Sequence, residues 1–530
     1  MMRHTTATMN LGRLLSDTAR LWPDRPALIR GHREWTWAEL DARVNAAVAG
    51  LRALGVRPGD RILVQAKNGE PMFATPWIAW KLGAVWVPTN HRLTPPEIAY
   101  MAEMSGAVAA VYAPEFAAHL DAARAAAPSL RHVVALGEPR AGEHGFEELI
   151  AANMGAEAYE SEVHRDDPCW FFFTSGTTGR PKAAVLTHGQ LTFVTVNHLA
   201  DLMPGLSPTD TSLVVAPLSH GAGAHMLSQV ARGAASVLPE SDHLDPEEVW
   251  RLVERHRVAN MFTVPTIVKR LVEHPAVDAH DHGSLRHVVY AGAPMYRADQ
   301  VLALEKLGPV LVQYYGLGEV TGNITVLRPD MHSLDDNAPG VGSVGVPRTG
   351  MEIAIRDRDG RRLGPGEQGE VCIRGPAVFA GYYENDEANA KAFRDGWFHT
   401  GDLGVIDVAG FLTLTGRASD MYISGGSNVY PREIEEVFLT HPAISEVAVL
   451  GVPHPDWGEA GVAVIVAEPG HAVEAETLLG FLDGKLAKYK WPRRVVVWDD
   501  LPKSGYGKVP KHLIRDELFR RGDVTEGEAL

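Results

Sequence analysis

The stretch Phe173-Thr174-Ser175-Gly176-Thr177-Thr178-Gly179-Arg180-Pro181-Lys182 directly follows an apolar run, residues 169–173. The apolar run predicts a buried strand, and the polar stretch predicts the loop that leaves it. Glycine lacks a β-carbon and lets the backbone approach an anion closely, while hydroxyls and successive N–H groups donate hydrogen bonds to phosphate oxygens. The segment therefore predicts a phosphate-binding loop at the end of a buried strand.

Two other interpretations of this loop are an ordinary P-loop and a glycine-rich turn without function. The ordinary P-loop of kinases and GTPases ends in Gly-Lys-Ser/Thr, whereas here Pro181 stands between the last glycine and Lys182. A polar, glycine-rich turn without function is the usual interpretation of a looser glycine pattern. The ten-residue pattern favours a phosphate site of another type.

Length and charge restrict the class of protein. A chain of 530 residues is expected to form more than one domain. The net charge of −16 and the absence of a basic block argue against nucleic acid or an anionic membrane surface as the main partner. The polar N-terminus predicts no secretory signal, and Lys81 and two prolines interrupt the most apolar stretch, residues 72–88. We expect a cytoplasmic protein without a transmembrane segment, and the sequence leaves a homodimer open.

The two cysteines, Cys169 and Cys372, both lie in apolar, strand-like runs. This placement is typical of buried, reduced thiols in a cytosolic protein, and it predicts that neither acts as a nucleophile.

Short β-rich runs alternate with helical patterns through the first three quarters of the chain, which is the pattern of an α/β fold. Such runs occupy residues 212–217, 260–265, 287–292 and 310–316. Asp245-Pro246-Glu247-Glu248 supplies a cap, a first-turn proline and two acids, and so predicts the start of a helix.

The pattern changes twice towards the C-terminus. Residues 344–383 alternate in strands with tight turns, which predicts a small antiparallel unit. After Arg417 the order helix (432–439), strand pair (446–452 and 461–466), helix (476–487) and strand (494–498) predicts a separate α+β domain. The predicted domains are residues 1–416 and 421–530, joined by a hinge at 417–420.

Five motifs, one of which is a pair of segments, resemble in this order the motifs of the adenylate-forming ligases, the superfamily of AMP-forming acyl-CoA synthetases, adenylation domains and beetle luciferases. They are the loop at 174–182, Ala291-Gly292-Ala293-Pro294, Gln313-Tyr314-Tyr315-Gly316-Leu317-Gly318-Glu319, the pair Trp397–Asp402 and Gly416–Asp420, and Pro502-Lys503-Ser504-Gly505-Tyr506-Gly507-Lys508. The resemblance covers about residues 10–520. It implies a large N-terminal α/β domain with layered sheets and a small β-barrel, and a mobile C-terminal α+β domain.

The resemblance also implies the role of each motif. Thr174, Ser175, Gly176, Thr177, Thr178, Gly179 and Lys182 would bind the phosphates of ATP; Ala293, Pro294, Gln313, Tyr315 and Gly316 would surround the adenine; and Asp402 and Arg417 would contact the ribose or phosphate. Glu319 would hold Mg²⁺, Lys508 would promote adenylation, and His220 would gate the route between the acyl pocket and the thiol channel. Gly425 and Gly426 would lie against the pantetheine arm of CoA, and Ser419 would be the hinge.

Three residues depart from the family pattern. Gly318 stands where most relatives have a phosphate-binding Thr, Ala183 where they have Gly, and Ser419 where they have Asp or Lys. Thr321 and the preceding backbone are the two candidates to replace the missing hydroxyl at residue 318.

The reaction implied by the resemblance has two halves and uses ATP, Mg²⁺ and CoA. A carboxylate attacks the α-phosphate to give an acyl-adenylate and pyrophosphate, and the CoA thiol then displaces AMP. The small, apolar gate segment at residues 220–226 favours an uncharged fatty or aryl acid over acetate, an amino acid or a dicarboxylate. The alternatives are an adenylating enzyme with another acceptor and a catalytically weak nucleotide-binding homologue.

Overall fold

The structure is a computed structural model that describes residues 7–174, 181–293, 295–417, 420–424, 427–503, 509–525 and 528. The chain divides into two compact units. The first contains Met1–Pro294, Val301–Ile353 and Ile373–Phe398; the second contains Met295–Gln300, Ala354–Cys372 and His399–Leu530. Within the described residues, no helix combines the length and apolar composition needed to cross a membrane.

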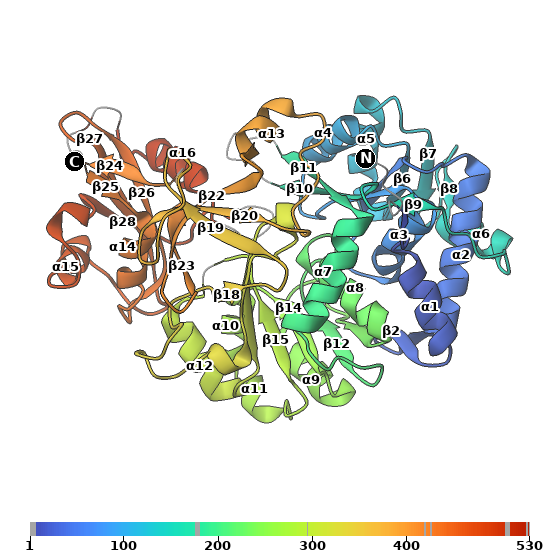
Figure 1. Cartoon of the computed structure of the whole chain (residues 1–530), viewed down its shortest axis with the longest axis horizontal. Helices are drawn as coiled ribbons and strands as arrows, with labels where there is room; N and C mark the ends of the chain where they lie inside the picture. Colours follow the sequence, from blue (N-terminus) through green and yellow to red (C-terminus); the bar gives the residue numbers. More distant parts are fainter. Residues whose placement is uncertain are drawn as a thin grey trace. The chain divides into compact units, whose positions relative to one another are not determined.

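Two large sheets form the frame of the first unit (Figure 1). The nine-stranded sheet has the order β18 (Val346–Pro347), β17 (Thr325–Leu327), β16 (Leu311–Tyr315), β15 (His287–Tyr290), β14 (Asn260–Thr263), β12 (Thr211–Val214), β13 (Ala235–Leu238), β2 (Pro26–Arg30), β3 (Arg33–Thr36). The seven-stranded sheet has the order β11 (Lys182–Thr187), β10 (Pro168–Thr174), β5 (Val85–Pro88), β4 (Arg61–Gln65), β6 (Ala109–Tyr112), β7 (His132–Ala135), β8 (His144–Gly145). A two-stranded sheet joins β1 (Ala7–Thr8) and β9 (Val163–His164).

The predicted α/β pattern is confirmed in the nine-stranded sheet. The four runs identified in the sequence are β12, β14, β15 and β16, which pair in parallel as neighbours. The helix predicted after Asp245 is α9 (Pro246–His256), and the Asp245 side chain accepts hydrogen bonds from the N–H groups of Glu247 and Glu248. The short loops and crossover helices place the carboxyl ends of these strands at one edge.

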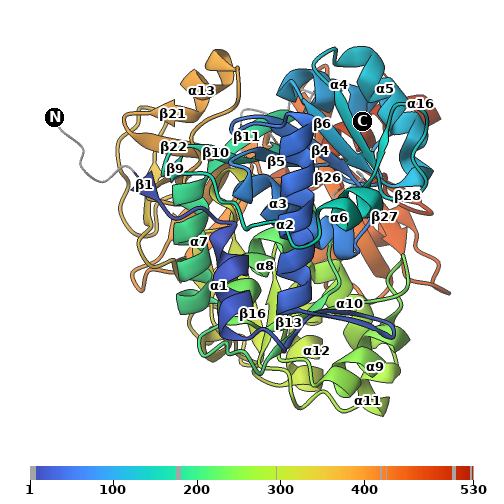
Figure 2. The same cartoon turned by 90° about the vertical axis from the view of Figure 1, so that its right-hand side faces the viewer.

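Helices cover the sheets of the first unit. Those N-terminal to the phosphate loop are α1 (Arg13–Leu21), α2 (Trp37–Leu54), α3 (Glu70–Lys81), α4 (Pro95–Ser105), α5 (Ala117–Ala126) and α6 (Phe146–Asn153). Those that follow are α7 (His188–Asp201), α8 (Gly221–Arg232), α10 (Pro265–Glu273), α11 (Ala276–Ala279) and α13 (Asp386–Ala392), while α12 (Arg297–Leu307) begins in the second unit and ends in the first. In Figure 2, α1, α2, α7 and α8 run side by side, and Thr18 of α1 donates a hydrogen bond to the carbonyl of Val230 in α8.

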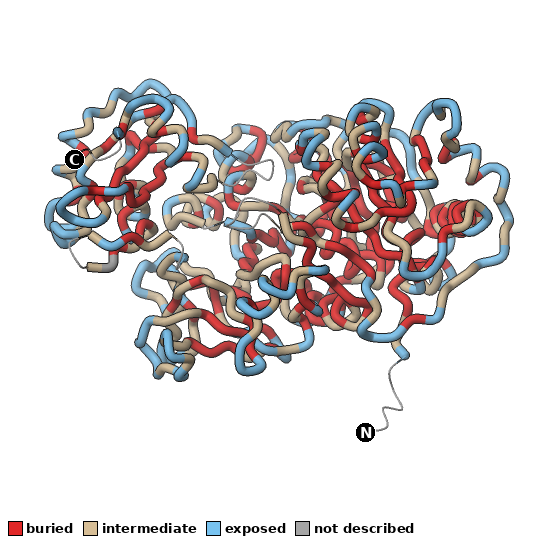
Figure 3. The backbone as a smooth tube through the Cα atoms, turned by 90° about the horizontal axis from the view of Figure 1, so that it is seen from above, coloured by how far each residue is buried: buried red, intermediate tan, exposed pale blue. Residues whose placement is uncertain are grey.

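Both cysteines are free and buried, Cys169 in β10 and Cys372 in β20 (Gly369–Arg374), as the apolar runs predict. The apolar stretch at residues 72–88 contains most of α3, then a turn, then β5, and Pro76 lies inside the helix. In Figure 3 the buried residues, drawn in red, run through the interior of the first unit.

The antiparallel unit predicted over residues 344–383 supplies β19 (Glu352–Arg356) and β20 (Gly369–Arg374) to a sheet that extends further along the chain than predicted. The order of this sheet is β19, β20, β22 (Trp397–Ile406), β21 (Phe393–Arg394), and β23 (Leu412–Arg417) also pairs with β22. The remaining sheet contains β25 (Ser427–Val429), β24 (Tyr422–Ser424), β27 (Gly458–Ala467), β26 (Ile444–His454) and β28 (Arg494–Trp498). The helices of this part are α14 (Pro431–Phe438), α15 (Ala475–Phe481) and α16 (Lys511–Arg521).

The predicted C-terminal pattern is correct in order and wrong at one boundary. The helix expected over 476–487 ends at Phe481, six residues early. The chain turns at Gly484, whose φ of +73° is a conformation that glycine adopts without the steric cost of a side chain.

Candidate active site

The two ends of the predicted phosphate loop lie opposite each other. β10 and β11 are antiparallel neighbours, and their register pairs Thr174 with Lys182. The structure therefore places both ends of the loop at one point on the edge of the seven-stranded sheet. The predicted phosphate ligands Ser175, Gly176, Thr177, Thr178 and Gly179 lie outside the described residues.

Glu319 lies beside Thr174 although 145 positions separate them. The Thr174 hydroxyl donates a hydrogen bond to Oε1 of Glu319 at 3.2 Å, and the Tyr382 hydroxyl donates to the same oxygen at 2.9 Å. Only 5% of Glu319 is exposed. A carboxylate and two hydroxyl oxygens form the kind of all-oxygen donor set that a hard cation such as Mg²⁺ prefers.

Tyr382 is the site residue that sequence reasoning missed. Residues 380–383 pair with β11, so that Tyr382 lies opposite Ala184. Nζ of Lys182 lies 4.5 Å from the centroid of the Tyr382 ring, within cation–π range. Burial and the charge of Glu319 raise the pKa of Tyr382 well above its usual value, so its hydroxyl is a protonated donor at neutral pH. The two adjacent tyrosines after Gly381 are the only signal in the sequence.

Phe172 explains the unusual Gly318. A β-carbon on residue 318 would lie 2.6 Å from Cδ1 and Cε1 of Phe172 and 3.0 Å from Cγ2 of Thr174. Separations below 3.0 Å require something to move. Threonine at 318 is therefore incompatible with the present position of the Phe172 ring, and the departure from the family pattern is a packing adaptation.

Thr321, one of the two candidates to replace the missing hydroxyl at residue 318, is bonded to another side chain. Thr321 is buried, and its Oγ1 accepts a hydrogen bond from Nε2 of Gln190 at 3.2 Å. The same amide donates to the carbonyl of Ala377 at 2.7 Å. This bonding ties Thr321 to the interior beside α7.

The predicted adenine-binding residues gather at the end of β16. Gln313 and Tyr315 are alternate residues of the strand and share one face. Oε1 of Gln313 accepts a hydrogen bond from the Tyr290 hydroxyl at 3.1 Å. A β-carbon at Gly316 would lie 2.4 Å from Cα of Gly322, so only glycine permits this close backbone approach. Ala293 is exposed in the loop after β15, and Pro294 lies outside the described residues.

His220 is placed at the start of α8 and near the phosphate loop strand. It is the residue before the first residue of α8, and its ring centroid lies 4.7 Å from that of Phe172. Its Nδ1 lies 3.0 Å from the carbonyl oxygen of Ser219. His220, Phe172 and Gly318 thus form a continuous series of contacts ending next to Glu319.

In the second unit, Asp402 and Arg417 lie opposite each other on β22 and β23. Nε of Arg417 lies 2.9 Å from Oδ1 of Asp402, and the Asp402 side chain is 7% exposed against 48% for Arg417. The two predicted ribose and phosphate ligands therefore belong to one ion pair. Ser419, Gly425, Gly426 and Lys508 lie outside the described residues.

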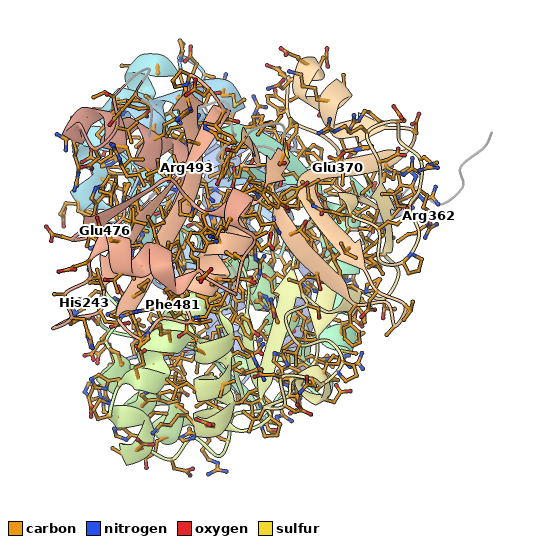
Figure 4. All side chains as sticks on the ribbon, turned by 90° about the vertical axis from the view of Figure 1, so that its left-hand side faces the viewer. His243, Arg362, Glu370, Glu476, Phe481 and Arg493 are labelled. Atoms are coloured by element: carbon orange, nitrogen blue, oxygen red, sulfur yellow. The ribbon has the colours of Figure 1, made fainter. Side chains whose placement is uncertain are left out.

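The second unit also contains a cluster of three polar residues, Glu370, Cys372 and His399. Nδ1 of His399 lies 2.8 Å from Oε2 of Glu370 and 3.3 Å from Sγ of Cys372 (Glu370 is labelled in Figure 4). Ligand atoms of these three residues lie within 4.8 Å of one another, close enough for a metal ion. Hydrogen bonds account for the same contacts, since Oε1 of Glu370 also accepts from the Gly401 N–H at 3.1 Å.

Comparison with known proteins establishes the family. The AMP-binding enzyme family model matches residues 15–383, and the model of the AMP-binding enzyme C-terminal domain matches residues 433–508. The chain belongs to this family of adenylate-forming enzymes. The resemblance inferred from the motifs, the α/β fold class and the assignment as a ligase are confirmed.

Individual relatives match over nearly the whole chain. A feruloyl-CoA synthase from an Amycolatopsis species is 38% identical over 499 residues, covering 94% of this chain and 96% of the relative. The structure of the anthranilate CoA ligase AuaEII in complex with anthranoyl-AMP superposes with a TM-score of 0.88 at 26% identity, covering 97% of this chain and 98% of that one. The amide bond synthetase McbA from Marinactinospora thermotolerans gives 0.86 at 29% identity, covering 96% and 99%.

Proposed function

We propose that this protein is an AMP-forming acyl-CoA synthetase acting on an aryl or medium- to long-chain acid. The carboxylate oxygen attacks the α-phosphorus of ATP and pyrophosphate leaves; the CoA sulfur then attacks the acyl carbon, and AMP leaves. The observation that carries the proposal is the convergence of Thr174, Lys182, Glu319 and Tyr382 at the two ends of the phosphate loop.

The residues of the first unit bind and orient ATP. Glu319 would hold Mg²⁺, which when bound offsets the negative charge of the phosphates. Thr174 and Tyr382 hold the Glu319 carboxylate in one orientation through Oε1. Nζ of Lys182 lies over the ring of Tyr382, whose hydroxyl bonds Glu319, and this position suits a phosphate-binding cation.

Other roles rest on the resemblance. Gln313, Tyr315, Gly316, Ala293 and Pro294 would surround the adenine; Asp402 and Arg417 would bind the ribose, and Gly425 and Gly426 would contact CoA. Lys508 would place a positive charge where two anions meet, and residues 417–420, with Ser419, would form the hinge between domains 1–416 and 421–530.

The acceptor in the second half-reaction has one specific alternative. McbA is named as an amide bond synthetase, and its TM-score of 0.86 is close to the 0.88 of the anthranilate CoA ligase AuaEII. An amine acceptor is therefore the second candidate. A catalytically weak homologue is disfavoured because Gly318 is explained by the packing of Phe172 rather than by loss of a functional side chain.

Product analysis tests the proposal. The protein is incubated with ATP, Mg²⁺, CoA and a series of acids running from acetate through octanoate to cinnamate and ferulate. We expect AMP and pyrophosphate in equal amounts, acyl-CoA by mass spectrometry, and kcat/KM that rises along the series because a longer apolar tail is buried. ADP and phosphate as products would exclude adenylation, and AMP release that depends on an added amine instead of CoA would identify the other acceptor.

A further inference from the structure

One carboxylate on β20 holds the part of β22 that leads to Asp402. Glu370, labelled in Figure 4, is the second residue of β20, which neighbours β22 in the sheet. Its Oε1 accepts a hydrogen bond from the Gly401 N–H at 3.1 Å, and its Oε2 accepts one from Nδ1 of His399 at 2.8 Å. Both oxygens of Glu370 therefore bind the segment 399–402, which ends at the residue proposed to bind the ribose.

The backbone conformation of Gly401 explains why this segment needs an anchor. Its φ is +74°, in the left-handed region that glycine adopts readily and other residues rarely. A β-carbon here would meet nothing within 4 Å, so the conformation, and not a lack of space, calls for glycine. Because glycine is also free to adopt many other conformations, the hydrogen bond from its N–H to Glu370 stabilises this one directly before Asp402.

The side chain of Thr400 links the same segment to the next residue of β20. Its Oγ1 donates a hydrogen bond to the carbonyl of Val371 at 2.7 Å and accepts one from the Asp402 N–H at 3.0 Å. Glu370 and Thr400 thus fix the backbone N–H groups of residues 401 and 402. Since the backbone sets the direction of the bond from Cα to Cβ, these contacts also set the direction in which the Asp402 side chain leaves the strand.

Asp402 is held in a second way, through its own carboxylate. Only 5% of the residue is exposed, and its Oδ1 lies 2.9 Å from Nε of Arg417. Arg417 therefore orients the carboxylate group, whereas Glu370 and Thr400 hold the backbone that carries it. Hydrogen bonds weaken steeply when their angles are poor, so a shift of this backbone would weaken any bond that Asp402 makes to a ligand.

We infer that Glu370 is a positioning residue, which acts through Gly401 and His399 to aim Asp402 at the ribose hydroxyls of the nucleotide. This inference rests on the proposed function, in which Asp402 binds the ribose, and adds a residue to which the resemblance gives no role. Loss of Glu370 should weaken the recognition of the ribose and leave the recognition of the base unchanged. A carboxylate that only stabilises the sheet would instead affect all nucleotides alike.

The test compares the Kd values of three nucleotides, measured by isothermal titration calorimetry. They are AMP, 2′,3′-dideoxy-AMP, which lacks both ribose hydroxyls, and inosine monophosphate, which keeps the ribose and changes the base. We expect the wild-type protein to bind AMP at least about tenfold more tightly than dideoxy-AMP, because a charged acceptor bonds the hydroxyls. This ratio of Kd values, called the ribose ratio, cancels general losses of affinity.

The variants should change the ribose ratio in a fixed order. We expect it to approach one in Asp402→Ala and to fall by at least about threefold in Glu370→Ala, while the preference for AMP over inosine monophosphate stays as in the wild type. Glu370→Gln keeps the volume but has a single side-chain oxygen to accept hydrogen bonds, so its ribose ratio should be intermediate. Once Asp402 is alanine, further replacement of Glu370 should leave the ratio unchanged.

Glu367→Ala is the matched control. Glu367 is a carboxylate of the same unit, shortly before β20, and its Oε2 accepts a hydrogen bond from the Gly364 N–H at 2.7 Å in an exposed turn. Its replacement should leave the ribose ratio and the base preference as in the wild type.

A wild-type ribose ratio in Glu370→Ala would overturn the inference, and so would a wild-type protein that binds AMP and dideoxy-AMP equally well. If Glu370→Ala does not fold, a wild-type ratio in Glu370→Gln overturns the inference on its own. Binding of AMP requires no acid, so these measurements are independent of turnover. A protein that shows the expected ratios and forms no acyl-CoA would retain this inference and lose the proposed function.

Discussion

The ring of Phe172 occupies the space that a β-carbon on residue 318 would need, with Cδ1 and Cε1 both 2.6 Å from that position. Gly318 directly precedes Glu319, and Phe172 contacts His220. The glycine at this family position is therefore accompanied by a bulky residue on β10, a strand of the seven-stranded sheet, 146 positions away in sequence.

This relationship predicts a non-additive pair of mutations. Gly318→Thr alone should destabilise the protein by about 1–3 kcal/mol through overpacking and lower the rate of adenylation. Phe172→Ala alone should cost stability through the cavity it leaves. In the double variant the smaller residue at 172 leaves room for the threonine. The double variant should therefore lose less free energy of unfolding than the sum of the two single losses. Denaturant unfolding and pyrophosphate release measure both quantities; strict additivity would show that the two residues do not compete for space.

Removal of the carboxylate at residue 319 should affect chemistry more than folding. We expect Glu319→Gln to lower the rate of adenylation by about 10²–10³, because an amide does not replace a charged cation ligand. Tyr382→Phe removes only one of the two hydrogen bonds to Oε1 and should have a smaller effect. The measurement is pyrophosphate release across a range of Mg²⁺ concentrations. Rates that remain near wild type in Glu319→Gln at every Mg²⁺ concentration would exclude the assigned role.

Substitution of Lys508, the residue that the resemblance assigns to adenylation, is expected to affect the two half-reactions differently. Lys508→Ala should cripple adenylation and leave transfer from a supplied acyl-adenylate to CoA largely intact. The reason is that a positive group is needed where the carboxylate meets the α-phosphate, and the family resemblance puts this lysine in the site only in the conformation used for that first step. Stopped assays of each half-reaction check this. Equal losses in both would mean that Lys508 is structural or acts in both steps.

Residues 417–420 are predicted to be the hinge, and Ser419→Pro tests this. Proline fixes φ, so a rotation that uses this residue should be hindered. We expect one half-reaction to slow more than the other, with Ser419→Ala as the control that keeps the backbone free. Unchanged rates for both half-reactions in Ser419→Pro would place the hinge elsewhere.

Local sequence patterns were enough to predict the strands of the parallel sheet and the residues at the two ends of the phosphate loop. The runs at 212–217 and 260–265 are strands β12 and β14 because their apolar, β-branched residues suit the interior of a parallel sheet. The contacts of Tyr382 with Glu319 and Lys182 could not be predicted, because they depend on the pairing of residues 380–383 with β11. For the same reason the sequence gives no sign that Phe172 excludes a side chain at 318.

Acid stability provides the last prediction. Burial lowers the pKa of His188 and His287 to about 4 and that of His225 to about 3, below the ordinary value of about 6.5. The unfolded chain therefore binds more protons than the native state in the window between about pH 6.5 and 4. The stability that these neutral histidines contribute is present above pH 6.5 and is lost as the pH falls through this window.

Each such histidine adds up to one proton to the difference, or about 1.4 kcal/mol per pH unit. Buried carboxylates also titrate on acidification, so the total slope alone does not identify the source. Denaturant unfolding of the wild type and of His188→Leu at several pH values separates the contribution of the histidine from that of the carboxylates. We expect the free energy of unfolding of the variant to fall less steeply from pH 6.5 to 4.5, by about one proton. Parallel curves for the two proteins would show that His188 is already protonated in the native state or stays neutral in both states.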